Sequence, residues 1–322
     1  MFLLFCRMKV QGQFIFCSLF GLLLLLFLSA FQTEKGISRE KLGQKLFFDP
    51  ILSSDSSVSC ASCHRPEFYF ADTLALSKGV LNGKTRRNTP SVLNMASREL
   101  MFWDGRAGNL EHQALFPVQD MNEMNLPVSM AIRRLNRNNA YRKFFRQVYG
   151  EAPNEKNLRD CLAAFERTLE TSGSRFDDAM NGKTVLSSDE KAGHKIFVGK
   201  GKCFDCHFGQ DFTGDEFRNI GLFDGKKWSD AGRFEVTKDS ADLGKFKVPG
   251  LRNVAKTAPY MHNGALKTLR EVIDFYANPE ILVPEAMGTD SLIRGGIILS
   301  ESEKLQLEAF LKTLTSPPFK LQ

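Results

Sequence analysis

The sequence has almost no cysteine available for disulfide bonds. Of its seven cysteines, two lie before residue 32, four belong to two Cys-x-x-Cys-His segments, and only Cys161 remains. A small secreted fold built on a disulfide framework is therefore excluded. Cys161 falls on an apolar helical face, and we expect it to be a small core residue.

The sequence also lacks any long alternation of apolar and polar residues, so we expect no extended β-sheet. Basic residues are not interleaved with aromatic ones in the manner of a nucleic-acid-binding surface. Without such a pattern, the formal net charge of +6 is no indication of a nucleic-acid partner, and we expect none.

An apolar segment precedes the main part of the chain. Arg7 and Lys9 are followed by an uncharged, leucine-rich run over residues 14–31, which is the layout of an export signal. The run is also long enough to stay uncut as an N-terminal membrane anchor. We interpret residues 1–31 as a signal peptide or anchor, and we expect the rest of the chain to lie in the periplasm.

Two Cys-x-x-Cys-His segments, residues 60–64 and 203–207, are typical of covalent haem attachment. In each segment two thiols attach the porphyrin and the histidine ligates the iron. The residues expected to do this are Cys60, Cys63, His64, Cys203, Cys206 and His207. A zinc site or a redox dithiol is disfavoured, because the pairs begin 143 residues apart and a histidine directly follows each. The propionates of two haems would also offset most of the positive charge.

The remaining pattern is helical. Apolar periodicity predicts helices within residues 40–48, 128–149 and 155–171. Three more helices should begin at capping boxes, in which a hydroxyl residue precedes a glutamate by three positions. The boxes are Ser187 with Glu190, Thr268 with Glu271, and Ser300 with Glu303.

The predicted fold class is all-α, with two cytochrome c-like haem domains and long loops. One haem segment lies in each half of the chain, and a polar break separates the halves at residues 173–182. We expect an N-terminal peroxidatic haem domain over residues 32–182 and a C-terminal electron-transfer haem domain over residues 183–322.

From Leu42 to Leu314 the chain resembles the bacterial di-haem cytochrome c peroxidase family, which includes the MauG-type enzymes. The resemblance rests on the two haem segments and on an ordered series of shorter matches. These are LFFDP at residues 46–50, RNTP at 87–90, FWDGRA at 102–107, QA at 113–114, AFERT at 164–168, GKFKVP at 244–249 and TAPYMH at 257–262.

The resemblance implies roles for individual residues. His64 would ligate the haem that reacts with peroxide, and His207 the haem that supplies electrons. Glu123 aligns with the family's distal glutamate, an acid/base group beside the open iron position, and Gln113 aligns with a residue lining the same pocket. Trp103 aligns with the tryptophan between the two haems.

A calcium ion is also implied. Asn88, Thr257 and Pro259 align with positions that bind a bridging calcium in the family, and amide and carbonyl oxygens suit that ion. The alternative interpretation of these three residues is that they are ordinary turn residues without a metal. His262 matches a family histidine near the second haem, where support of the haem is favoured over ligation.

Two positions depart from the typical peroxidases. The histidine that caps the peroxidatic iron in those enzymes is replaced, counting from Cys60, by Val80, which cannot ligate iron. The methionine that ligates the second haem is replaced, counting from His262, by Tyr276, as in MauG-type enzymes. Met287 and, less favourably, Met261 are the alternative ligands.

The sequence therefore favours an exported di-haem c-type peroxidase that reduces hydrogen peroxide with electrons from a small donor protein, a cytochrome c or a cupredoxin. A MauG-type oxidase acting on a protein or organic substrate is the alternative that Tyr276 raises. A non-catalytic di-haem electron carrier is a third hypothesis, and Glu123 argues against it. A homodimer and membrane attachment through the N-terminal segment stay open.

Overall fold

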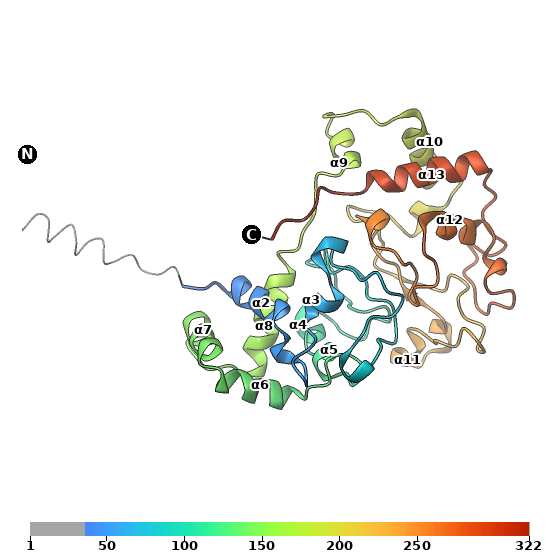
Figure 1. The fold of residues 1–322 in the computed structure, drawn as a ribbon. Coiled ribbons are helices and arrows are strands. Elements are labelled where there is room, and N and C mark those ends of the chain that lie inside the picture. The colour runs from blue at the N-terminus through green and yellow to red at the C-terminus, as the bar shows by residue number, and fades with distance from the viewer. Residues whose placement is uncertain (1–35, 322) are drawn as a thin grey trace, which may run out of the picture. The chain divides into compact units, whose positions relative to one another are not determined.

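The computed structural model describes residues 36–321, and the fold is mostly helical (Figure 1). The chain from Ser38 onward forms one compact unit, and the predicted export segment lies outside the described residues. The division into haem domains at residues 182/183 stays a prediction. The α-helices are α2 Arg39–Phe48, α3 Cys60–Cys63, α4 Leu110–Gln113, α5 Phe116–Gln119, α6 Val128–Arg137, α7 Asn139–Tyr149, α8 Glu155–Glu166, α9 Arg175–Met180, α10 Ser188–Val198, α11 Phe234–Thr237, α12 Leu269–Ala277 and α13 Glu301–Thr313.

Local signals placed the helix starts well. All three predicted capping boxes form, at the N-termini of α10, α12 and α13. The helical stretch predicted over residues 128–149 is divided into α6 and α7, because the Asn138 side chain accepts hydrogen bonds from the backbone of Ala140 and Tyr141 and starts a new helix. The helix expected to reach residue 171 ends at Glu166.

In the first half of the chain, α2 packs against α8 at very close range. The contact needs a glycine, because a Cβ atom at Gly43 would lie 1.8 Å from the backbone oxygen of Cys161. Cys161 is fully buried, which confirms the predicted core position. One turn along each helix, the rings of Phe47 and Phe165 meet at 5.1 Å between centroids.

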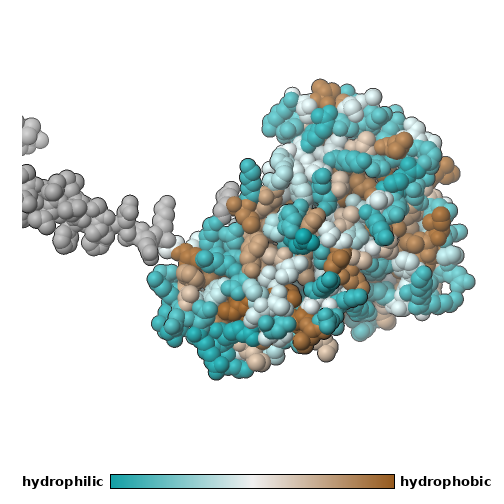
Figure 2. All heavy atoms as spheres, viewed as in Figure 1, coloured by the Kyte–Doolittle hydropathy of each residue, from teal (hydrophilic) through white to brown (hydrophobic). Residues whose placement is uncertain are grey.

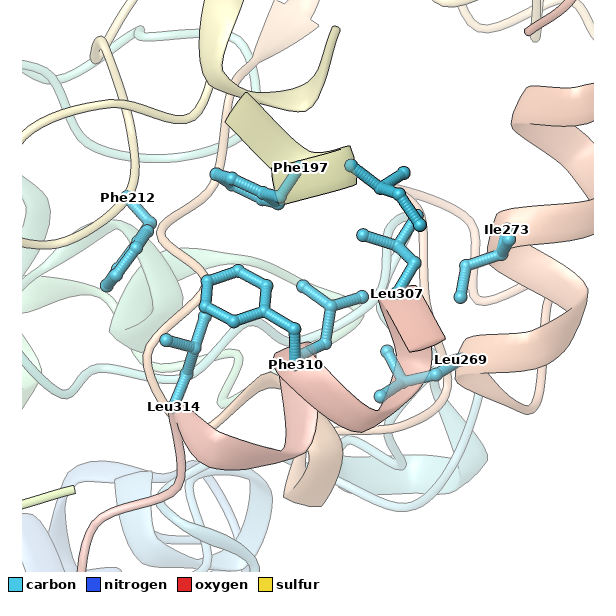
Figure 3. Packing of buried hydrophobic residues seen from close by; sticks show 9 residues of the cluster. Phe197, Phe212, Leu269, Ile273, Leu307, Phe310 and Leu314 are labelled. Carbon is cyan, nitrogen blue, oxygen red and sulfur yellow. The ribbon is translucent and has the colours of Figure 1, made fainter. Parts of the chain in front are cut away.

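The second half repeats this arrangement with α10 and α13. A Cβ atom at Gly193 would lie 1.9 Å from the backbone oxygen of Gln306. Four residues after the glycine, Phe197 meets Phe310 at 5.1 Å, inside the apolar cluster drawn in Figure 3. Each Cys-x-x-Cys-His segment thus follows a helix that is held by a glycine contact and a phenylalanine pair.

Alanine at either glycine should destabilise the fold. Gly43→Ala and Gly193→Ala each place a methyl group against backbone rather than against a movable side chain, and overpacking of this kind costs about 1–3 kcal/mol. Chemical denaturation of the haem-loaded protein would measure the change in midpoint. Gly108→Ala is the matched control, since nothing lies within 4 Å of a Cβ there; equal midpoints for all three variants would contradict the close contacts.

Strand structure is minimal in the described part of the chain. Strand β1, Phe217–Arg218, pairs antiparallel with β2, Phe246–Lys247, and Phe217 faces Lys247 across the ladder. Long loops make up most of residues 65–90 and 208–258, as predicted. On the face drawn in Figure 2, apolar side chains are scattered among polar ones. Within residues 36–321, no helix has the length and apolarity needed to span a bilayer.

Candidate haem and active site

The first Cys-x-x-Cys-His segment presents its histidine in a fixed orientation. The segment forms the short helix α3, capped by reciprocal hydrogen bonds of Ser59 and Ser62. His64 places its Nδ1 atom 3.2 Å from the backbone oxygen of Phe70. Burial lowers the pKa of His64, so the ring is neutral and its Nε2 atom is left to bind a metal. This is the second-sphere arrangement expected of an axial haem ligand.

The second segment repeats this arrangement around a large cavity. The Nδ1 atom of His207 lies 3.0 Å from the backbone oxygen of Phe212, and burial again lowers the pKa of the ring. A cavity of about 320 Å³ is lined by His207 together with Cys203 and Cys206. Two thiols and an imidazole facing one mostly apolar space fit a covalently attached porphyrin.

Glu123 is a half-buried carboxyl close to the first segment. Its pKa is raised to about 7, because partial burial and, to a smaller extent, the charge of Asp120 raise it more than Arg106 lowers it. Its negative charge also raises the pKa of the Cys60 and Cys63 thiols, which places it near the first haem attachment. A carboxyl that titrates near neutral pH can both accept and return a proton.

Gln113, at the end of α4, has a buried Oε1 atom with no hydrogen-bond donor among residues 36–321. A buried acceptor left unpaired is costly unless a ligand supplies the donor. The resemblance predicts that Gln113 lines the pocket of the first haem, and there the O–H group of a bound ligand would supply the missing donor.

Val80 is hydrogen-bonded through its backbone to Glu123. It is 1% exposed, and its backbone N–H donates to the backbone oxygen of Glu123 at 2.8 Å. The flanking Gly79 and Gly83 allow the loop to close on Asn122, since a Cβ at either position would fall within 3 Å of the Asn122 backbone oxygen. The position expected to hold the family's capping histidine is thus an apolar residue packed beside Glu123.

Trp103 lines the cavity of the second segment. Its indole Nε1–H donates to the backbone oxygen of Asn88 at 2.8 Å. The backbone N–H of Asn88 donates in turn to the backbone oxygen of His262 at 2.7 Å. These two bonds fix the indole ring against the loop that follows the first haem segment.

The three candidate calcium residues Asn88, Thr257 and Pro259 all line this cavity, and the calcium site stays a prediction. The amide nitrogen of Asn88 donates to the backbone oxygens of Leu74 and Ala75, both at 3.2 Å. That pairing fixes the orientation of the side chain.

The candidate ligands of the second haem separate in space. Tyr276, on α12, lines the cavity, and burial together with Cys203 and Cys206 raises the pKa of its phenol. Met261 also lines the cavity, whereas Met287 is outside its lining and half exposed.

The His262 ring is held in place by an aromatic neighbour. It stacks flat on Phe246, with 3.6 Å between ring centroids, and burial lowers its pKa to about 4. The ring is therefore neutral and held by its neighbour. This agrees with the predicted supporting position rather than with ligation.

One feature near the first haem was not expected to be buried. Glu166, on α8, is 7% exposed, and burial raises its pKa to about 8. Its charge raises the pKa of Cys60, so it lies close to the haem attachment. Helical periodicity could have predicted this burial, because Glu166 follows the core residue Leu162 by one helical turn.

The sequence model of the di-haem cytochrome c peroxidase family matches residues 38–185. The chain is also 37% identical, over 282 residues, to the methylamine utilization protein MauG of Methylorubrum extorquens, covering 86% of this chain and 78% of that protein. The chain belongs to the di-haem cytochrome c peroxidase family. The resemblance seen in the sequence is confirmed, and with it an oxidoreductase that carries two c-type haems.

Two further relatives agree with this membership. The cytochrome c551 peroxidase of Nitrosomonas europaea is 36% identical over 295 residues, covering 90% of this chain and 84% of that protein. The crystal structure of a MauG-like protein associated with microbial copper homeostasis matches with a TM-score of 0.78 and 32% identity, covering 86% of this chain and 89% of the other. The mostly helical fold predicted from the sequence is thereby confirmed.

Proposed function

We propose that this chain is a periplasmic peroxidase that reduces hydrogen peroxide to two waters with two electrons from a small redox protein and two protons. The single observation that carries the proposal is the half-buried Glu123 carboxyl close to the first haem segment, whose pKa of about 7 suits proton transfer in both directions. The unpaired Oε1 atom of Gln113 supports it. An electron carrier needs neither group, so the hypothesis of a non-catalytic carrier is disfavoured.

When bound, the haem iron supplies the redox chemistry and an open coordination position for peroxide. Glu123 would take the proton from the inner peroxide oxygen and deliver it to the outer oxygen, which then leaves as water. Gln113 would accept a hydrogen bond from the peroxide O–H and orient it.

Electrons would enter at the second segment and pass Trp103. The indole is fixed in the wall of the cavity that contains His207. Beside the second attachment site, Phe204 and Phe208 are both about half exposed, and exposed aromatic side chains favour contact with another protein. A small cytochrome c or cupredoxin fits this entry point.

The finer structural assignments belong to the same proposal. The two glycine-dependent helix pairs support one cytochrome c-like haem domain in each half of the chain. The presence of Asn88, Thr257 and Pro259 in the lining of one cavity supports a calcium site. Covalent haem attachment supports export, and Tyr276 supports phenolate ligation of the second haem.

Turnover tests the proposal directly. The haem-loaded protein, mixed with reduced cytochrome c or cupredoxin, should consume one peroxide for every two electron donors oxidised. Failure to consume peroxide with any donor would overturn the peroxidase assignment. Slow peroxide loss without a donor, accompanied by oxidation of an added phenol or protein, would favour the MauG-type oxidase that Tyr276 suggests.

Valine at position 80 should leave the first haem reactive without prior reduction. We expect Val80→His to slow the reaction of fully oxidised protein with peroxide at least about tenfold, because imidazole can occupy the open position and only the ligand-free fraction reacts. Stopped-flow absorbance would measure the rate before and after reduction of the second haem. Val80→Ala is the control, since alanine cannot bind iron; equal rates for both variants would contradict the assigned position of Val80.

A further inference from the structure

Two tyrosines of α7 donate hydrogen bonds to carboxylates. The hydroxyl of Tyr141 donates to Asp49 at 2.6 Å, and the hydroxyl of Tyr149 donates to Asp160 at 2.7 Å. Burial and the neighbouring carboxylate raise the pKa of both phenols well above the usual value, so both stay protonated at neutral pH. A protonated phenol with a carboxylate partner is poised to lose a proton when it loses an electron.

The other three tyrosines of the chain lack such a partner. Tyr69 donates to the backbone oxygen of Ser316 at 2.9 Å, and Tyr260 to that of Val254 at 2.8 Å. A backbone carbonyl is too weak a base to take the proton of an oxidised phenol. The hydroxyl of Tyr276 makes no hydrogen bond within the described residues. Only the two α7 tyrosines can therefore pass a proton to a neighbour as they are oxidised.

The α7 tyrosines connect to the first haem segment through packed side chains. The ring of Phe47 lies 6.3 Å from the His64 ring and 5.1 Å from the Phe165 ring. Phe47 belongs to α2 and Phe165 to α8.

The two tyrosines are hydrogen-bonded to these same helices. Tyr141 donates to Asp49, the C-cap residue of α2, and Tyr149 donates to Asp160 on α8. Helix α7 is therefore joined to the two helices whose phenylalanine pair lies beside the His64 ring.

We propose that Tyr141 and Tyr149 are oxidised in place of an electron donor. This happens when peroxide has oxidised the first haem site and no donor protein reduces it. Each tyrosine gives one electron to the oxidised site and its hydroxyl proton to its aspartate, which leaves a neutral phenoxyl radical beside a carboxylic acid. One electron from an outside reductant, with return of the proton, restores the pair. The oxidant is peroxide, so this inference rests on the proposed function.

The two pairs differ in burial and in the contacts of the carboxylate. Asp160 also faces Arg39 at 3.4 Å, whereas Asp49 also accepts a hydrogen bond from the backbone N–H of Ile51. Tyr141 is buried while Tyr149 is half-buried, so an outside reductant reaches Tyr149 more easily. The radical should accordingly persist longer on Tyr141 than on Tyr149.

Electron paramagnetic resonance of freeze-quenched protein tests the inference. The haem-loaded full chain is mixed with peroxide and no electron donor, with peroxide consumption measured on the same sample. The wild type should give a tyrosyl signal whose splitting changes when ring-deuterated tyrosine is incorporated. The signal should be lost in the Tyr141→Phe/Tyr149→Phe double variant and kept in Tyr69→Phe, which alters a tyrosine of the apolar cluster that packs against Cys60 but leaves the α7 pairs intact.

Replacement of the proton acceptors gives an independent readout. Asp49→Asn/Asp160→Asn keeps both phenols and should lose the signal as well, so a folding failure of one double variant leaves the other to decide. A tyrosyl signal that survives both double variants, or that disappears in Tyr69→Phe, would overturn the inference. If the wild type consumes no peroxide, the proposed function fails; if it consumes peroxide without forming a tyrosyl radical, only this inference fails.

Discussion

Glu123→Gln should lower the rate of peroxide reduction by about 10²–10⁴-fold, the usual contribution of a positioned general acid–base group. Glutamine keeps the size of the side chain but cannot accept the proton of the bound peroxide. The loss should appear in kcat and kcat/KM together, since the proton moves only in the transition state. Haem content and absorption should be unchanged, because Glu123 neither attaches nor ligates either haem.

The role of Glu123 also predicts how the rate of peroxide reduction changes with pH. Proton abstraction requires the ionised carboxylate, and the pKa of Glu123 is raised to about 7. The wild-type kcat/KM should therefore fall as pH drops below about 7, approaching tenfold per pH unit. The Glu123→Gln profile should be flat there. Asp120→Asn removes a charge that raises this pKa, so its acid limb should shift to lower pH.

Glu166→Gln is the matched control. Glu166 is a buried glutamate near Cys60, and its pKa, like that of Glu123, is raised. The same substitution there tests whether any carboxyl with a raised pKa near the first haem matters. We expect its turnover to remain within a few-fold of wild type. Equal losses in the two variants would mean that Glu123 has no special part in O–O cleavage.

Short-range signals allowed much of the fold to be predicted. Capping boxes need only four consecutive residues, and the structure forms all three as predicted. The core position of Cys161 followed from helical periodicity alone. The break at Asn138 was missed because the helical pattern resumes directly after the polar residues 136–139. The start of the new helix there depends on a single side-chain cap.

Long-range features could not be read in the same way. The contact of Gly43 with Cys161 and the bond of Tyr141 to Asp49 join residues far apart in sequence, and no local pattern specifies such partners. The neutral-range pKa of Glu123 depends on burial by distant segments. Glu123 and Gln113 were found only through family motifs, since an isolated carboxyl in sequence usually indicates a solvated surface.

Tyr276→Met should raise the reduction potential of the second haem by on the order of 0.1 V or more, because axial-ligand identity alone spreads haem potentials over about 0.8 V. A phenolate stabilises ferric iron through its negative charge, and a neutral thioether does not. Tyr276 lines the cavity that contains His207, so a methionine at this position can reach the same space. Spectroelectrochemical titration of the haem-loaded protein would measure the shift.

The alternative ligands give this experiment its controls. Met287 lies outside the cavity lining and is half exposed, so Met287→Leu should leave the potential unchanged. Met261 lines the cavity, so it could either ligate the iron or only pack against the haem. Loss of a ligand in Met261→Leu should shift the potential strongly, whereas loss of a packing contact should not. A large shift in Met261→Leu with none in Tyr276→Met would transfer the ligand assignment to methionine. The second haem would then resemble that of the typical peroxidases, and the MauG-type oxidase hypothesis would lose the residue that motivates it.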